Sequence, residues 1–194
     1  MSTFVLATAN PHKTEEIRQV LADFDVELLP RPDDVPDVDE TDDTLQGNAL
    51  LKATALCEAT GHAAVADDTG LFVDALDGRP GVTSARFAGE GATFEDNVDK
   101  VLSELEGVKA NDRTARFRTV VAAVYPSGES WWVEGVLEGT MLRARRGEHG
   151  FGYDPIFAPL GAGGRSLAEL TADEKNAISH RGNALRAFAA RLRE

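Results

Sequence analysis

Short apolar runs alternate with segments of helical periodicity, and this alternation restricts the fold of the chain more than any other feature. Residues 3–7 and 26–29 are predicted strands, and apolar residues recur at helical spacing between them. Asn10 and Pro11 begin that intervening helix, as its N-cap and its first residue. Strands that alternate with helices predict a mixed α/β sheet.

The same pattern continues after an acidic, proline-rich segment, residues 30–43, which is predicted to be a loop. A second helix is predicted over residues 44–60, and Gly61 ends it. A strand then begins at His62 and is predicted to end in the sequence Asp67-Asp68-Thr69-Gly70.

A third helix and a hairpin follow. Thr93 is the predicted cap of the helix, and Gly107 stops it. Residues 115–125 and 130–142 are β-rich and flank a Pro-Ser-Gly-Glu sequence, so they are predicted to form an antiparallel hairpin.

The C-terminal segment is predicted to contain two helices rather than one. In one continuous helix, Lys175 and Arg181 would point about 120° apart and would not meet the same ligand. A break near Ser179, with a new helix after it, would direct His180, Arg181 and backbone N–H groups to one place.

The net charge of −13 disfavours nucleic acid as a ligand, because binding phosphates along a duplex needs a basic face. The charge is uneven: residues 143–194 hold nine Lys and Arg against six Asp and Glu, a net of +3, so residues 1–142 carry −16. The acidic part is either a solvated surface or a site where a divalent cation bridges carboxylates to a small polyanion.

The sequence predicts a cytoplasmic protein that does not span a membrane. Its longest unbroken apolar run is about five residues, whereas a membrane-spanning helix needs about 20. The N-terminal residues lack the basic segment of a secretory signal. With Cys57 as the only cysteine, no internal disulfide can form.

Several segments carry residues suited to chemistry, and each has a structural alternative. Asp67-Asp68, at the predicted strand end, is either a ligand site or an ordinary turn. The segment from Thr8 to Lys13 is either an anion site at a helix N-terminus or a simple helix start. The aromatic loop Phe151-Gly152-Tyr153-Asp154 can stack and bond a base, or it is a packed turn.

Two further residues are ambiguous when taken alone. Lys52, in an otherwise apolar helix, is by itself a surface lysine. His180 alone is more typical of a structural histidine than of a catalytic one.

Taken together, these segments resemble the inosine/xanthosine triphosphate pyrophosphatase family. The resemblance extends from Val5 to Leu192. The blocks that carry it are Thr8-x-Asn10-x-x-Lys13, Glu40-Thr41, Asn48-Ala49-x-x-Lys52-Ala53, Asp67-Asp68-Thr69-Gly70-Leu71, Pro80-Gly81, Ser84-Ala85-Arg86, Phe151-Gly152-Tyr153-Asp154-Pro155-Ile156-Phe157, Glu169-Leu170-Thr171 and Glu174-Lys175-Asn176-Ala177-Ile178-Ser179-His180-Arg181-Gly182.

The resemblance implies a single domain over residues 1–194 with an α/β fold: an elongated mixed sheet with flanking helices, and two lobes around a central cleft. It also implies the activity, which is Mg²⁺-dependent hydrolysis of ITP, dITP and XTP to the nucleoside monophosphate and pyrophosphate. The implied partner is a small nucleotide, with neither nucleic acid nor membrane bound, and the implied assembly is a homodimer.

The resemblance also assigns roles to residues. Glu40 and Asp68 would hold the metal, and Asp68 would be the catalytic base, supported by Asp67. The triphosphate would contact Thr8, Ala9, Asn10, Pro11, His12, Lys13, Lys52, Thr69, Lys175 and Arg181. The base would be enclosed by Phe151, Gly152, Tyr153, Asp154, His180 and Arg181.

Two positions depart from the family pattern. Thr69 stands where the family has Ser, and this change keeps the hydroxyl group. Gly47 stands where an acid is common before Asn48, which leaves Glu40 as the acid assigned to the metal.

Two other functions remain open at this point. One is a pyrophosphatase for pyrimidine or other modified nucleotides, and the other is a catalytically silent nucleotide-binding module. The blocks around Phe151 and His180 favour purines over the first, and the presence of the implied acids and lysines disfavours the second.

Overall fold

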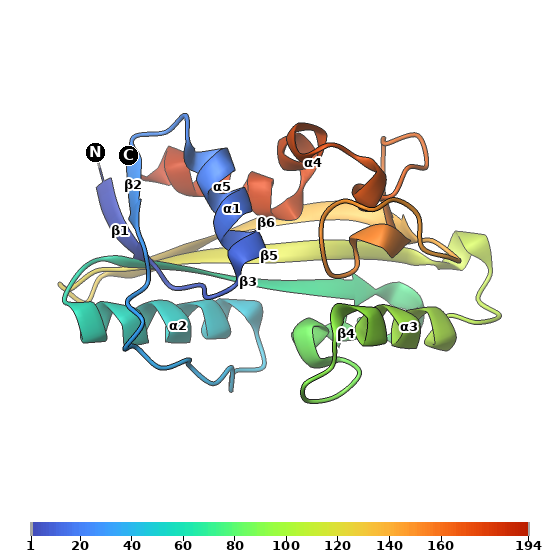
Figure 1. Ribbon diagram of the computed structural model, residues 1–194, viewed down its shortest axis with the longest axis horizontal. Helices are drawn as coiled ribbons and strands as arrows, with labels where there is room; N and C mark the ends of the chain where they lie inside the picture. Colours follow the sequence, from blue (N-terminus) through green and yellow to red (C-terminus); the bar gives the residue numbers. More distant parts are fainter. Residues whose placement is uncertain (1, 194) are drawn as a thin grey trace. The chain divides into compact units, whose positions relative to one another are not determined.

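A computed structural model describes residues 2–193, which form a mixed α/β fold (Figure 1). The helices of this part of the chain are α1 (Pro11–Leu21), α2 (Leu45–Thr60), α3 (Phe94–Glu104), α4 (Ala172–Ile178) and α5 (His180–Arg191). The strands are β1 (Ser2–Leu6), β2 (Val26–Leu29), β3 (Ala64–Val73), β4 (Pro80–Gly81), β5 (Thr114–Val124), β6 (Ser130–Met141) and β7 (Phe157–Pro159).

The strands form one mixed sheet in the order β2-β1-β3-β5-β6-β7, with β4 paired to β3. β1 is parallel to β2 and β3, whereas the β3–β4 and β6–β7 pairs are antiparallel. The mixed sheet predicted from the sequence is therefore confirmed. None of the helices in the described chain has the length and apolar character needed to cross a bilayer.

Most predicted element boundaries are confirmed. Asn10 caps α1 with Pro11 in the first turn, Thr44 caps α2, and Gly61 ends α2 in the left-handed conformation at φ 67°. The predicted C-terminal break is present, because Ser179 has extended backbone between α4 and α5.

The predicted end of β3 is wrong, because Asp67 and Asp68 lie inside this strand rather than after it. The neighbouring strand β1 ends at Leu6, which is in register with Val65. β3 continues past this point, because its later residues Leu71 and Phe72 pair with β4. The two acids therefore follow the end of β1, not the end of their own strand.

The chain folds into two compact units. Unit 1 comprises the chain up to Asp68, Thr119–Gly135 and the chain from Arg181 onward, and unit 2 comprises Thr69–Arg118 and Val136–His180. The boundaries between the units fall within β3, β5, β6 and α5.

In unit 1, alternate residues of the strands serve two separate hydrophobic cores. Phe4 and Leu6 of β1 pack with α1 and α5, whereas Val5 packs with α2. Figure 1 accordingly shows α1 and α5 on one face of these strands and α2 on the other. This placement follows from the period-two alternation of side chains along a strand.

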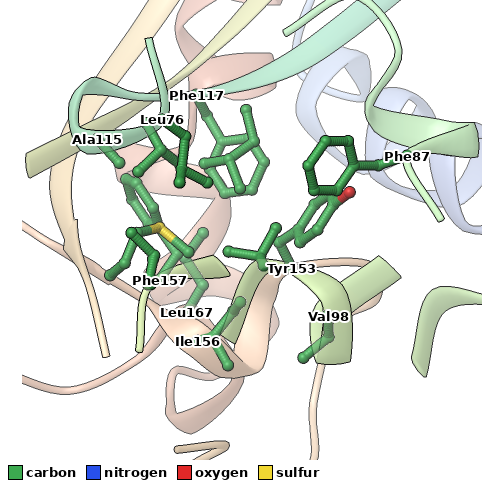
Figure 2. Close-up of a cluster of buried hydrophobic side chains, with 14 of the residues drawn as sticks. Leu76, Phe87, Val98, Ala115, Phe117, Tyr153, Ile156, Phe157 and Leu167 are labelled. Carbon is green, nitrogen blue, oxygen red and sulfur yellow. The ribbon is translucent and has the colours of Figure 1, made fainter. Parts of the chain in front are cut away.

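In unit 2, one aromatic-rich core joins β3, α3, β5 and the segment that follows β6 (Figure 2). Tyr153 lies in this core, and its hydroxyl donates to the Ser84 carbonyl oxygen at 2.8 Å. The Ser84 hydroxyl makes two more buried hydrogen bonds. Its Oγ accepts from Leu71 N at 2.9 Å and donates to Gly81 O at 2.6 Å. Ser84 therefore ties β3, β4 and the Tyr153 loop together.

Replacing Ser84 with alanine should lower the free energy of unfolding by about 1–3 kcal/mol, because a buried N–H and a buried carbonyl lose their partner. Urea unfolding measures this change. Ser103→Ala is the matched control, since Ser103 is exposed in α3 and its side chain makes no hydrogen bond within residues 2–193, and its effect should stay within about 0.5 kcal/mol. Equal losses in the two variants would contradict this role of Ser84.

Candidate functional site

Unit 1 contains a cluster of acids and cations, here called the carboxylate cluster, which is built from α1, α2, β3, α5 and the loop before α2. Its members are Lys13, Glu16, Glu40, Lys52, Asp67, Asp68 and Arg181. All of these residues except Glu16 are predicted from the sequence to be functional. The structure brings these predicted residues together.

Asp67 forms the buried half of the cluster. Its Oδ2 lies 3.2 Å from Lys13 Nζ and accepts from Arg181 Nε at 3.2 Å. Arg181 also donates through Nη1 to Glu16 Oε2, so its guanidinium is held between two carboxylates. Asp67 and Arg181 are only 3% and 2% exposed.

The surrounding cations keep Asp67 ionised. Burial alone would raise the pKa of its carboxyl, but Lys13 and Arg181 outweigh this effect and hold the pKa far below its usual range. For Lys13 burial is the larger effect, and it lowers the pKa of the ammonium despite the attraction of Asp67.

Asp68 has different surroundings, although it is the next residue. Lys52 Nζ lies 2.9 Å from both Asp68 Oδ1 and Glu40 Oε1. Asp68 Oδ2 is buried and has no hydrogen-bond partner within residues 2–193. Burial raises the pKa of Asp68, Glu40 adds to this rise, and Lys52 only partly opposes it.

The two adjacent carboxyl groups therefore differ in basicity. Asp67 stays ionised and holds cations in place, whereas the raised pKa of Asp68 lets it accept a proton more readily than Asp67 does. Paired carboxylates whose pKa values are driven apart are typical of sites that divide acid–base roles.

The loop that carries Glu40 is fixed at its far end by the buried Asn48 side chain. Asn48 Oδ1 accepts from Asp42 N at 2.9 Å, and Asn48 Nδ2 donates to Asp42 O at 3.1 Å. The Asp42 carboxylate in turn accepts from Thr44 N at 2.8 Å. These bonds hold the chain two residues after Glu40 against the start of α2.

Gly47 makes this arrangement possible. A Cβ atom at position 47 would lie about 2 Å from the Asp42 carboxyl group, much closer than atoms can approach. The space left by the glycine is thus occupied by the Asp42 side chain.

The segment from Thr8 to Lys13 forms the turn into α1, as predicted. Asn10 Oδ1 accepts from the backbone N of His12 at 3.0 Å and of Lys13 at 3.3 Å, and Asn10 N donates to Thr8 Oγ1 at 3.1 Å. Because Asn10 already binds two of the first helical amides, the positive charge at this end of α1 comes mainly from the Lys13 side chain.

Unit 2 holds a second set of predicted residues around Asp154. Lys175 Nζ lies 2.6 Å from Asp154 Oδ2 and 4.9 Å from the centre of the Phe151 ring. The backbone N of Phe151 donates to the same Asp154 oxygen at 2.9 Å. This carboxylate therefore fixes the lysine and the aromatic loop together.

Other predicted residues of unit 2 are held by the core. The His180 ring stacks on Phe117, with 4.6 Å between centroids and 23° between planes. Burial raises the pKa of the Tyr153 hydroxyl, so this group stays protonated. Thr69 is partly exposed in β3, directly after Asp68. Gly152 has φ 62°, a left-handed conformation that favours glycine.

The structure groups two residues differently from the resemblance. Lys175, assigned to the triphosphate, contacts Asp154 and Phe151, which are assigned to the base. Arg181, assigned partly to the base, contacts Asp67 and Glu16. Both assignments stay predictions.

Sequence reasoning missed two residues of these sets. Glu16 has a detectable signal, because it lies three residues after Lys13 and so on the same face of α1. Gly150, at φ 74°, leaves room for the Asp154 carboxylate, and a Cβ there would lie 2.1 Å from Oδ2. The closely spaced glycines at 150 and 152 were the available signal for it.

The chain matches the model of the Ham1 family over residues 4–191. It is 52% identical to a dITP/XTP pyrophosphatase of Thermoanaerobacter over 183 residues, which cover 93% of this chain and 91% of the relative. It is 45% identical to the dITP/XTP pyrophosphatase of Bacillus subtilis over 188 residues, 96% of this chain and 94% of the relative.

Solved structures give the same result. The fold is similar to that of a HAM1 protein from Coxiella burnetii, with a TM-score of 0.89, 42% identity, and coverage of 99% of this chain and 98% of the other. It is also similar to a nucleoside-triphosphatase, dITP/XTP pyrophosphatase, from Mycobacterium abscessus, with a TM-score of 0.76, 44% identity and 98% coverage of both chains. On this sequence match and this fold, the chain belongs to the Ham1 family.

Proposed function

We propose that the chain hydrolyses the non-standard purine nucleoside triphosphates ITP, dITP and XTP to the monophosphate and pyrophosphate, with Mg²⁺ as cofactor. The observation that carries the proposal is the pair Asp67 and Asp68, where an anchored anion stands next to a more basic carboxylate. The names of the relatives support the substrate class. A cytoplasmic homodimer belongs to the same proposal and rests on the family resemblance.

The carboxylate cluster fits a divalent cation of the magnesium type. Glu40 and Asp68 offer hard oxygen donors, and the buried Asp68 Oδ2 lacks a hydrogen-bond partner within the described residues. No group of three or more His, Cys, Asp or Glu side chains suited to holding an ion occurs in residues 2–193. Mg²⁺ is usually held by one or two carboxylates together with substrate phosphates and waters, so two carboxylates suffice.

In the proposed reaction, Asp68 accepts a proton from the water that attacks the α-phosphorus. A new bond forms from the water oxygen to this phosphorus, and the bond to the leaving pyrophosphate oxygen breaks. When bound, Mg²⁺ supplies positive charge that offsets the charge of the phosphates. Asp67 stays ionised and keeps Lys13 in position throughout.

Binding of the triphosphate is assigned to Lys13 and Lys52, with the Thr8–Lys13 turn and Thr69. Phosphate oxygens would compete with Glu40 and Asp68 for the Lys52 ammonium. Phosphoryl transfer depends mainly on positioning and on stabilisation of negative charge, which these cations provide.

Base recognition is assigned to the Phe151–Asp154 loop, His180 and Arg181. Hypoxanthine and xanthine have an O6 acceptor where adenine has an amino donor. Donors directed at O6 would be left without a partner by ATP, at a cost of about 1–3 kcal/mol for each buried group.

The first test is hydrolysis of a panel of nucleoside triphosphates with Mg²⁺, with the products identified by chromatography. We expect a nucleoside monophosphate and pyrophosphate from ITP and XTP, with no diphosphate. Release of orthophosphate in the first turnover, without added inorganic pyrophosphatase, would contradict the proposal. So would saturable nucleotide binding without any turnover, which indicates a silent binding module.

Asp68→Asn should lower kcat for ITP by about a hundredfold or more, because the amide keeps the shape but cannot accept a proton. Initial-rate kinetics measure this loss, and circular dichroism checks the fold. Asp43→Asn, at an exposed acid of the loop before α2, should leave kcat unchanged. Activity of the Asp68 variant within a few-fold of the parent would exclude this residue as the base.

Arg181→Ala should reduce kcat/KM for ITP far more than for ATP, because ATP does not use a donor to O6. In the parent, ITP and XTP should be preferred over ATP by about a hundredfold, which corresponds to about 3 kcal/mol. His180→Ala should reduce the preference for ITP over ATP less than Arg181→Ala does, since water can replace the imidazole ring.

Arg186→Ala, on the same helix, is the control for Arg181→Ala and should preserve the preference for ITP. If Arg181→Ala slows ITP and ATP by the same factor, the arginine acts through Asp67 and Glu16 and not on the base. This result would remove Arg181 from base recognition and leave the proposed reaction intact.

A further inference from the structure

Unit 1 contains a pocket of about 440 Å³ that shares Thr8 and Ala9 with the turn assigned to the triphosphate, but that extends to residues to which the proposed reaction gives no role. One wall comes from the end of β1 and the residues after it, Leu6, Thr8 and Ala9, and another comes from residues 30–33 after β2. The pocket lining includes no member of the carboxylate cluster. Its volume lies within the range of about 300–1,000 Å³ that is usual for small-molecule sites.

The location of the pocket follows from the topology of the sheet. β1 and β2 are adjacent and parallel, and their carboxyl ends lead to helices on opposite faces, α1 and α2 (Figure 1). The pocket lies beside the carboxyl ends of both strands, the end of an α/β sheet at which ligands bind.

The basic residues of the pocket stand out against its acidic surroundings. Residues 2–68 contain fifteen Asp and Glu but only four Lys and Arg. Lys13 and Lys52 belong to the carboxylate cluster, and the other two, Arg18 and Arg31, both line the pocket. Two of the four cations of this segment thus line one pocket, together with two acids, Asp33 and Asp37.

Both arginines are available to an incoming anion. The Arg18 side chain is exposed and makes no ion pair or hydrogen bond within residues 2–193. Arg31 donates to Val35 O at 2.7 Å and to Asp37 Oδ1 at 2.5 Å. The Asp37 side chain is 84% exposed, so this ion pair is weak and an anion can replace the aspartate.

The remaining lining suits a compact organic body attached to the anion. Thr8 Oγ1 accepts from Asn10 N, which leaves its hydroxyl proton to donate to a ligand. Leu6, Pro30, Pro32 and Val35 supply apolar surface. A phosphate monoester of a ring-containing molecule fits both parts of the lining. Arginine pairs with phosphate through two parallel hydrogen bonds, and the ring packs against the apolar wall.

We propose that this pocket binds a small organic phosphate monoester, at a site separate from the carboxylate cluster. The phosphate pairs with Arg18 and Arg31, and the organic body lies on the proline and aliphatic wall. This inference does not depend on the proposed hydrolysis, because it is tested by binding alone.

The experiment is a titration of the full chain with adenosine 5′-monophosphate, and binding is measured by calorimetry and by the amide NMR shifts of Arg31 and Val35, which lie outside the turn assigned to the triphosphate. Arg18→Ala and Arg31→Lys should each weaken binding at least about tenfold, because each loses a charge-assisted pair. The lysine variant retains a cation for Asp37, so the loop stays folded. Arg165→Ala, at an exposed arginine of unit 2, is the charge-matched control and should leave the affinity unchanged.

Lys13→Ala distinguishes this pocket from the proposed triphosphate site and should leave binding of the monophosphate unchanged. Loss of binding in Lys13→Ala, with binding kept in both arginine variants, would overturn the proposal. The absence of saturable binding up to about 10 mM would also overturn it. Inorganic phosphate that binds as tightly as the monophosphate would reduce the pocket to a simple anion site and refute the organic ligand.

Discussion

The buried carboxylate of Asp67 is the interaction on which the arrangement of unit 1 depends. It lies inside β3 and pairs with Lys13 of α1 and Arg181 of α5, and Arg181 pairs in turn with Glu16. An unpaired charge at this depth would cost several kcal/mol, so the partners hold three elements of secondary structure in register around one anion. Because the buried charge needs both partners, Asp67 fixes the positions of α1 and α5 relative to β3.

This constraint also explains how two consecutive acids acquire different properties. The strand directs successive side chains to opposite faces, so Asp67 meets the cations of α1 and α5 while Asp68 meets Lys52 of α2 and Glu40. Glu40 helps to raise the pKa of Asp68, whereas Lys13 and Arg181 lower the pKa of Asp67. The chemical difference within the pair follows from the pleat of the strand and from helices on both faces of the sheet.

The sequence predicts those parts of the fold that depend on local signals, such as Asn10 and Pro11 at the start of α1 and Gly61 at the end of α2. It misplaces the end of β3, because that end depends on which strands pair with it, and pairing is not a local property. Likewise, Lys13 and Lys52 were recognisable as cations, but their partners were not. A contact between Arg181 and Asp67 joins positions 114 residues apart, and no spacing rule reaches that far.

The glycine at position 47 has a consequence for how the start of α2 is closed. In a capping box, the third helical residue carries an acid that accepts the N–H of the N-cap residue. Here that position is Gly47, and Asp42 accepts the Thr44 N–H from outside the helix. A side chain at position 47 would displace Asp42. An acid at position 47 therefore requires a different residue at position 42, and loss of Asp42 requires an acid at position 47 to accept the Thr44 N–H. The two positions should therefore covary among related sequences.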